Sequence, residues 1–211
     1  FKMSKSRGNI IAPEEILEKY GADAFRQWSA LGAATGSDIM FNWNDVVAAS
    51  RFQTKLWNIT RFSLQQLARE WNRDARVTDL ADRWLLVRLS NTVDRVTLAM
   101  DTYQFDLALR ELRDFAWNVL ADNYIELVKG RLYGDGGGRD SACRALDITL
   151  DALFRMLAPF MPHFAEESYH HLREGGSGSV HAQSWVNLSF DDHDAARDGE
   201  ILAKVVSEIR R

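Results

Sequence analysis

Apolar residues recur every three or four positions along most of the chain, which is the spacing of an amphipathic helix. One long helix is predicted from Asn42 or Asn44 to about Trp71, and a second from Thr78 to about Asp101. Their apolar stripes are Phe52, Leu56, Ile59 and Leu67 in the first, and Leu85, Leu89, Val93, Val96 and Met100 in the second. The spacing continues over 105–132, 140–157 and 163–172. Such helices with short links predict an all-α, antiparallel helix bundle.

The two ends of the chain depart from this pattern. Pro13 at a first helical position and Gly21 just beyond the last predict a short helix, and a second one follows over 22–33. Near the other end, the run Gly175–Ser179 marks a boundary, 180–185 is a candidate strand, and helical spacing resumes at about Ala195. We therefore expect a loop and connecting segment over 1–43, the bundle over 44–175, and a C-terminal extension over 176–211.

Composition narrows the function classes. With 211 residues and 46% hydrophobic content, the chain can bury one good core. Its formal net charge of −4 excludes a globally basic nucleic-acid binder, so any RNA contact must come from a local patch, and we expect no DNA partner. The single cysteine, Cys143, and histidines without cysteine partners indicate neither a disulfide framework nor a metal site. No apolar run long enough for a membrane span and no signal peptide are visible, which predicts a cytoplasmic setting without membrane contact.

Positive charge gathers on the first long helix. Five basic residues and one acid, Glu70, lie between positions 51 and 73, giving a local charge of five minus one, or +4. The five are Arg51, Lys55, Arg61, Arg69 and Arg73. At about 100° per residue, Arg51, Lys55, Asn58 and Phe62 fall within about 60° of one another beside the apolar stripe. This helix is the best candidate for meeting phosphates, although a solvated basic face beside a core phenylalanine has the same pattern.

The first residues carry a second cluster of cations. Lys2, Ser4, Lys5 and Ser6 form a short polar stretch followed by Gly8. Two ammonium groups, two hydroxyls and backbone N–H groups suit a loop that closes on a polyphosphate. A solvated basic terminus is the alternative.

The order Lys-Met-Ser-Lys-Ser over 2–6 resembles the second signature of the class I aminoacyl-tRNA synthetases. The likeness extends over nearly the whole chain, to the valyl/isoleucyl/leucyl group, through 20–24, 52–62, 82–85, 115–118 and 158–162. Within that group, Gly36–Ile39 and Lys55–Asn58 are most similar to valyl members. Arg7, Tyr169 and Val186 depart from residues usual in the family, and none of them changes the lysines.

The resemblance implies a fold, a reaction and site residues. The fold is the anticodon-binding helical bundle, and the reaction is ATP-dependent activation of valine, with Mg²⁺ in the full enzyme, and its transfer to the tRNA for valine. By resemblance, Lys2 and Lys5 are catalytic, and with Ser4 and Ser6 they contact the ATP phosphates. The positions matching Lys55, Arg61 and Phe62 lie at the anticodon, with Arg51 and Asn58 on the same helix as further tRNA-binding candidates. Without a catalytic core, the chain is expected to bind no ATP and to have no turnover.

Three alternatives stay open. The chain could correspond to the same region of an isoleucyl-, leucyl- or methionyl-tRNA synthetase. It could be a non-enzymatic helical interaction module whose first residues match by coincidence, or a free-standing tRNA-binding protein. Because it begins inside a motif without methionine and ends within a helical pattern, we expect a piece of a larger protein.

Overall fold

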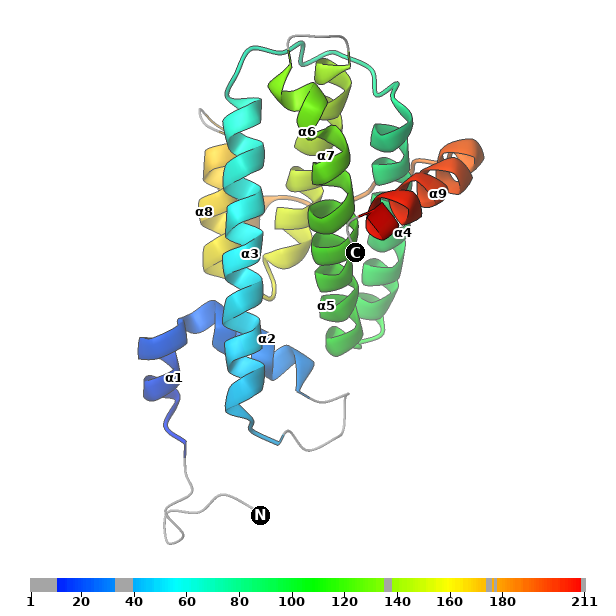
Figure 1. Ribbon diagram of the computed structural model, residues 1–211. Coiled ribbons are helices and arrows are strands. Elements are labelled where there is room, and N and C mark those ends of the chain that lie inside the picture. Colours follow the sequence, from blue (N-terminus) through cyan, green and yellow to red (C-terminus); the bar gives the residue numbers. More distant parts are fainter. Residues whose placement is uncertain (1–10, 33–39, 135–137, 174–175, 177, 210–211) are drawn as a thin grey trace, which may run out of the picture.

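The computed structural model describes residues 11–32, 40–134, 138–173, 176 and 178–209. Figure 1 shows these residues as helices joined mostly by short links, and no strand occurs among them, so the prediction of an all-α bundle is confirmed. The elements are α1 (Pro13–Tyr20), α2 (Ala22–Leu31), α3 (Trp43–Leu67), α4 (Leu80–Asp101), α5 (Phe105–Asp114), the π-helix η2 (Phe115–Tyr124), α6 (Ile125–Tyr133), α7 (Arg139–Leu157), α8 (Pro162–Leu172), the 3₁₀ turn η3 (Val180–Ala182) and α9 (His193–Ile209).

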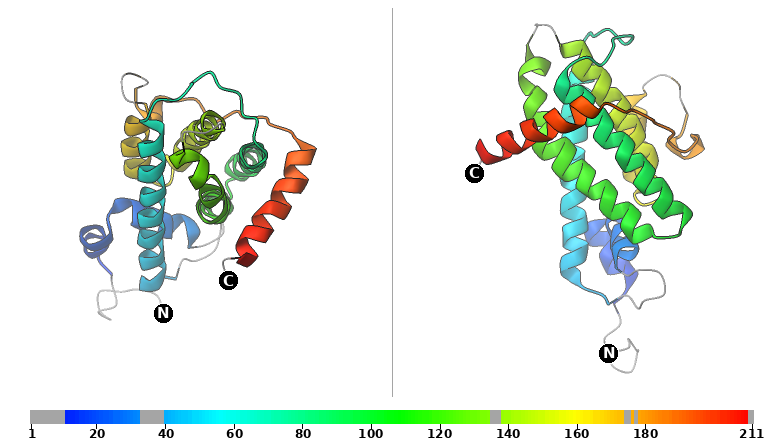
Figure 2. Two further views of the ribbon diagram at one scale, coloured as in Figure 1. Left: turned by 45° about the horizontal axis from the view of Figure 1, so that its top comes forward. Right: turned by 90° about the vertical axis from the view of Figure 1, so that its right-hand side faces the viewer.

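The core of the bundle forms around η2 and α7, each of which packs against both α3 and α4. The predicted stripe of α4 is buried through Leu85, Leu89, Val93 and Val96, while Met100 is only half-buried. The stripe of α3 likewise enters the core through Phe52, Leu56 and Leu67, and Ile59 packs against it partly buried. Figure 1 shows α3 between α8 on one side and the helices α5–α7 on the other, and the oblique view of Figure 2 agrees.

Helix α3 begins and ends near the predicted positions. The Asn42 side chain accepts a hydrogen bond from the backbone N–H of Asn44 at 3.0 Å and caps its start. The helix ends at Leu67, four residues earlier than predicted. There the indole Nε1 of Trp71 donates to the Leu67 carbonyl at 3.1 Å, so a side chain from the following loop satisfies one of the last helical carbonyls.

The predicted continuous helix over 105–132 contains a π-helical segment. Residues Phe115–Tyr124 form η2 between α5 and α6, and the Asn123 side chain donates to the Asn118 carbonyl five residues back at 2.7 Å. A wider turn changes which side chains face α3. Helical periodicity alone does not reveal such a segment, because the apolar spacing on either side still fits an α-helix.

The candidate strand over 180–185 is wrong. Val180–Ala182 form a 3₁₀ turn, whose start is capped by Ser179 accepting from the His181 N–H at 3.1 Å. Glu166 of α8 accepts from both the Ser179 hydroxyl and the Val180 N–H at 2.9 Å. The carboxylate satisfies the backbone that a neighbouring strand would otherwise pair.

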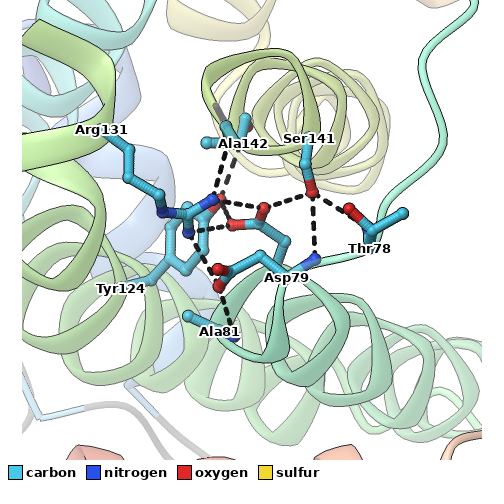
Figure 3. Close-up of polar contacts among 9 residues, drawn as sticks. Thr78, Asp79, Ala81, Tyr124, Arg131, Ser141 and Ala142 are labelled. Atoms are coloured by element: carbon cyan, nitrogen blue, oxygen red, sulfur yellow. Dashed lines mark hydrogen bonds and ion pairs between the residues drawn. The ribbon is translucent and has the colours of Figure 1, made fainter. Parts of the chain in front are cut away.

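A buried polar network ties together the ends of α4, η2, α6 and α7 (Figure 3). The fully buried Asp82 carboxylate accepts two hydrogen bonds from the Arg131 guanidinium at 2.7 and 2.8 Å, one from the Tyr124 hydroxyl at 2.8 Å and one from the Ser141 hydroxyl at 2.6 Å. Burial and the adjacent Asp82 carboxylate raise the pKa of Tyr124 well above its usual value. The network fixes the end of the bundle at which α3 also ends.

Helices at both termini pack onto the bundle. Asp23 of α2 accepts a hydrogen bond from the N–H of Phe164, at the start of α8, at 2.7 Å. At the other end, α9 lies against α4, where Trp84 Nε1 donates to Glu200 at 3.2 Å and Arg83 pairs with Asp192 at 2.6 Å (Figure 2). In the described part of the chain, no helix has the length and apolar character needed to cross a membrane.

Candidate nucleic-acid interface

The predicted site residues fall into two groups. Lys2, Ser4, Lys5 and Ser6 lie outside the residues that the structure describes. The other five, Arg51, Lys55, Asn58, Arg61 and Phe62, all belong to α3. Arg51, Asn58 and Arg61 are exposed, whereas Lys55 and Phe62 are half-buried along one edge of the helix.

Lys55 is held between an aromatic ring and a carboxylate, both from η2. Its Nζ lies 3.6 Å from the centroid of the Trp117 indole and 2.7 Å from Oδ1 of Asp122. Asp122 is half-exposed and Trp117 is 37% exposed, so this cluster lies at the surface. Because a surface ion pair is worth about 1 kcal/mol or less, Lys55 can exchange Asp122 for a phosphate at little cost.

Phe62 contacts another aromatic residue that sequence reasoning missed. Its ring meets that of Tyr133, at the end of α6, edge to face with centroids 6.0 Å apart, and it also packs against the core. Tyr133 is 62% exposed. The more accessible stacking surface on this edge of α3 is therefore Tyr133, with Phe62 behind it. Nothing in the local sequence pairs these residues, since they meet only once α6 has packed beside α3.

Arg61 lies on the other side of α3. Six residues at about 100° each place it about 120° around the helix axis from Lys55. There it lines a groove of about 690 Å³ between α3 and α8, together with Trp57, Trp71 and Arg73. The five predicted residues thus form no single cluster, and α3 is a ridge with polar side chains toward both flanks.

Only some of the basic side chains on and just beyond α3 are bound to other groups of the protein. Lys55 pairs with Asp122, and Arg69 donates to the Leu132 carbonyl at 2.9 Å. Within the described residues, the side chains of Arg51, Arg61 and Arg73 make no hydrogen bond or ion pair, and that of Arg73 only lies over the Trp71 ring, 5.4 Å from its centroid. Three arginine side chains at or just beyond α3 are therefore available for anions.

A second hollow, of about 660 Å³, lies between α2, α3 and α5–η2. It adjoins the Lys55 cluster, because Trp117 also lines it. Arg113 lines it, with its guanidinium 4.7 Å from the centroid of the Phe52 ring. Burial, and secondarily the nearby Arg110, lower the pKa of Arg113. Asp45 and Asp114 also line this hollow, so its charge is mixed.

Comparisons with known proteins agree with the fold. Residues 82–211 match the family model described as the anticodon-binding domain of tRNA ligase, and residues 1–42 match the model for class I tRNA synthetases (I, L, M and V). A crystal structure of a ternary complex of LeuRS from Agrobacterium radiobacter K84 with tRNA and LeuAMS superposes with a TM-score of 0.70. Its sequence identity is 21%, and the match covers 92% of this chain and 23% of that one, which establishes a shared fold.

Several curated relatives match this chain along its whole length. It is 50% identical over 218 residues to a valine–tRNA ligase of Methanosarcina barkeri, a match covering all of this chain and 25% of that protein. It is 48% identical to the valine–tRNA ligase of Natronomonas pharaonis and 47% identical to that of Archaeoglobus fulgidus, covering 99% and 100% of this chain and 24% of each ligase. The chain thus spans about a quarter of the length of these relatives. The resemblance noted in the sequence is confirmed, and the chain belongs to the family of anticodon-binding domains of tRNA ligases.

Proposed function

We propose that this chain is the anticodon-binding part of a valine–tRNA ligase and that it holds the tRNA for valine by its anticodon loop. Lys55 and Phe62 contact the loop on one flank of α3 and Arg61 on the other, with Arg51 and Asn58 between them. The observation that carries the proposal is the surface cluster of Lys55 and Trp117, 3.6 Å apart, in a chain 50% identical to a valine–tRNA ligase. Unpaired RNA bases are recognised by such combinations of aromatic rings, cations and amides.

The proposal includes a role for the first residues in the complete ligase. In its first step, the carboxylate of valine attacks the α-phosphate of ATP and pyrophosphate leaves, so negative charge builds up on the leaving group. We assign Lys2 and Lys5 to the β- and γ-phosphates, with hydroxyl donors from Ser4 and Ser6, and Mg²⁺ as a further counter-charge. This assignment comes from the sequence motif.

We also propose that the complete enzyme works in the cytoplasm.

The test measures binding of the 211-residue chain to transcripts with valine, isoleucine, leucine and methionine anticodons. We expect the valine transcript to bind most tightly. The double variant Lys55→Ala and Phe62→Ala should weaken that binding by about 2–4 kcal/mol in total, taking about 1–3 kcal/mol for each stacked base. Lys204→Ala, which removes an exposed lysine from α9, is the matched control and should leave affinity unchanged.

Two results would contradict the proposal. Tighter binding of an isoleucine, leucine or methionine transcript would assign the chain to another member of the group. Absence of salt-dependent RNA binding would instead favour a helical protein-interaction module. Because Phe62 packs against the core, circular dichroism of each variant must first show an unchanged fold. The single variant Lys55→Ala provides a second measurement that does not alter the core.

A further inference from the structure

We propose that the groove between α3 and α8 binds one further unpaired nucleotide of the same RNA loop. Its base would stack on Trp57, and its phosphate would lie between Arg61 and Arg73. This inference rests on the proposed function but concerns the opposite flank of α3 from Lys55 and Phe62. It adds Trp57, Trp71 and Arg73 to the RNA interface, and of these three only Arg73 was named from the sequence, as one of five cations on or near the first long helix.

The groove has the size and position for such a ligand. Its volume of about 690 Å³ lies within the range of small-molecule sites. Leu64 and Gln65 of α3, Ala68 just beyond the end of α3, and Leu172 of α8 also line it. It lies along the half of α3 that leads to Trp71, so a loop lying over the α3 ridge can reach both flanks at once.

Charge in the groove favours an anion. Arg173 is already neutralised, since its guanidinium donates to Asp147 at 2.6 Å and to Asp151 at 2.9 Å. Arg61 and Arg73 have no acidic partner in the described part of the chain, and both are exposed. His171, on the α8 side, lies 3.2 Å from Glu167. Two uncompensated guanidinium groups on one groove match a phosphate, which arginine binds through paired donors.

The aromatic rings in the groove are already fixed. Trp57 meets Phe164 edge to face with centroids 6.4 Å apart, and it remains 37% exposed. Trp71 is tied by its Nε1 to the Leu67 carbonyl at 3.1 Å, and Arg73 lies over its ring. A ring that is held in place before binding loses little conformational freedom on stacking. Trp57 therefore offers a prepared surface for a base.

The experiment uses the 211-residue chain and an anticodon stem-loop RNA of the tRNA for valine, with 2-aminopurine placed at each loop position in turn. At one position, stacking on Trp57 should quench the fluorescence of the base. Trp57→Ala should abolish that quenching and weaken binding about 5- to 150-fold, the loss expected for one stacked base. Arg73→Ala should weaken binding less and reduce the salt slope by about 0.7, the contribution of one phosphate contact in single-stranded RNA. Arg73→Lys should restore much of that slope.

Matched controls separate this inference from the proposed function. Trp185→Ala removes a similarly exposed tryptophan outside the groove, and Arg76→Ala removes an exposed arginine from the same connection as Arg73, so neither should affect binding. If Lys55→Ala weakens binding but Trp57→Ala and Arg73→Ala do not, the groove proposal is overturned and the proposed function stands. Equal losses with Trp185→Ala or Arg76→Ala would also overturn it. If the unaltered chain fails to bind the stem-loop, both the groove proposal and the proposed function are overturned. Arg73 is exposed in a loop, so its variants remain informative even if Trp57→Ala loosens the fold.

Discussion

Asp82 is the most deeply buried charged residue in the described part of the chain, and its carboxylate is 0% exposed at the junction of four helices. Four hydrogen bonds compensate the lost hydration, two of them from Arg131 (Figure 3). A buried pair is costly to break because the remaining charge is left without a partner. We expect Asp82→Ala to lower the free energy of unfolding by about 3–5 kcal/mol, measured by urea denaturation.

The control for Asp82 is an aspartate in a weaker ion pair. Asp106 lies 3.8 Å from Arg110, which is largely exposed, so Asp106→Ala should cost about 0.5 kcal/mol or less. Similar losses for both variants would mean that the buried network contributes no more than a surface contact.

The carboxylate of Glu166 makes the stability of the 3₁₀ turn η3 depend on pH. Burial alone would raise the pKa of Glu166, but hydrogen bonds from Ser179, the Val180 N–H and His170 together lower it. A lowered folded-state pKa means that the contact stabilises the fold above the unfolded-state value of about 4.3 and is lost as pH falls through the folded-state value. Hydrogen exchange of the Val180 amide, corrected for its intrinsic rate, should therefore lose protection as pH falls below about 4.3.

A glutamine at position 166 isolates this carboxylate. Glu166→Gln keeps the size of the side chain but removes the titration, so protection of the Val180 amide should be weaker at neutral pH and nearly constant below it. His181, 3.9 Å from the same carboxylate, also faces the group. A pH profile unchanged by Glu166→Gln would assign the loss of protection to another group.

At the scale of elements, the docking of α9 on α4 depends on a glycine. A Cβ added to Gly199 would lie 2.3–2.5 Å from Cβ, Cγ and Cδ1 of Trp84, which is 2% exposed. Those atoms are close to the α4 backbone and cannot move aside, so α9 would have to shift. We expect Gly199→Ala to cost about 1–3 kcal/mol and to raise hydrogen exchange in α9 before α4 is affected.

Gly130 of α6 is the matched control, because nothing lies within 4 Å of a Cβ added there. Alanine at this exposed helical position should stabilise the protein by about 0.5–1 kcal/mol through helix propensity alone. Opposite signs for the two substitutions would separate packing from propensity, whereas a stabilising Gly199→Ala would show that α9 does not rest on Trp84.

Periodicity predicted most helices because each buries an apolar stripe that is visible in its own residues. It missed the π-helical segment η2, because the apolar spacing around that segment still fits an α-helix. It was wrong for residues 180–182, because their backbone pairs with Glu166 of α8. The interface was predictable only in part for the same reason. Lys55 acquires Trp117 and Asp122 from an element about sixty residues later, and Phe62 acquires Tyr133. The position of Arg61 on the opposite flank followed from helical geometry, but the groove needed α8.

At the scale of the whole molecule, a chain with net charge −4 must bind RNA through a local excess of cations, so individual charges near α3 should matter more than the total. Asp122→Asn frees Lys55 from its ion pair and should tighten binding of the valine stem-loop about 2- to 5-fold at low salt, a gain that shrinks as salt rises. Fluorescence anisotropy over a salt series measures both effects. Asp94→Asn changes the net charge equally at an exposed position on α4 and should tighten binding far less. Equal gains from the two variants would mean that overall charge, and not the contact at Lys55, governs binding.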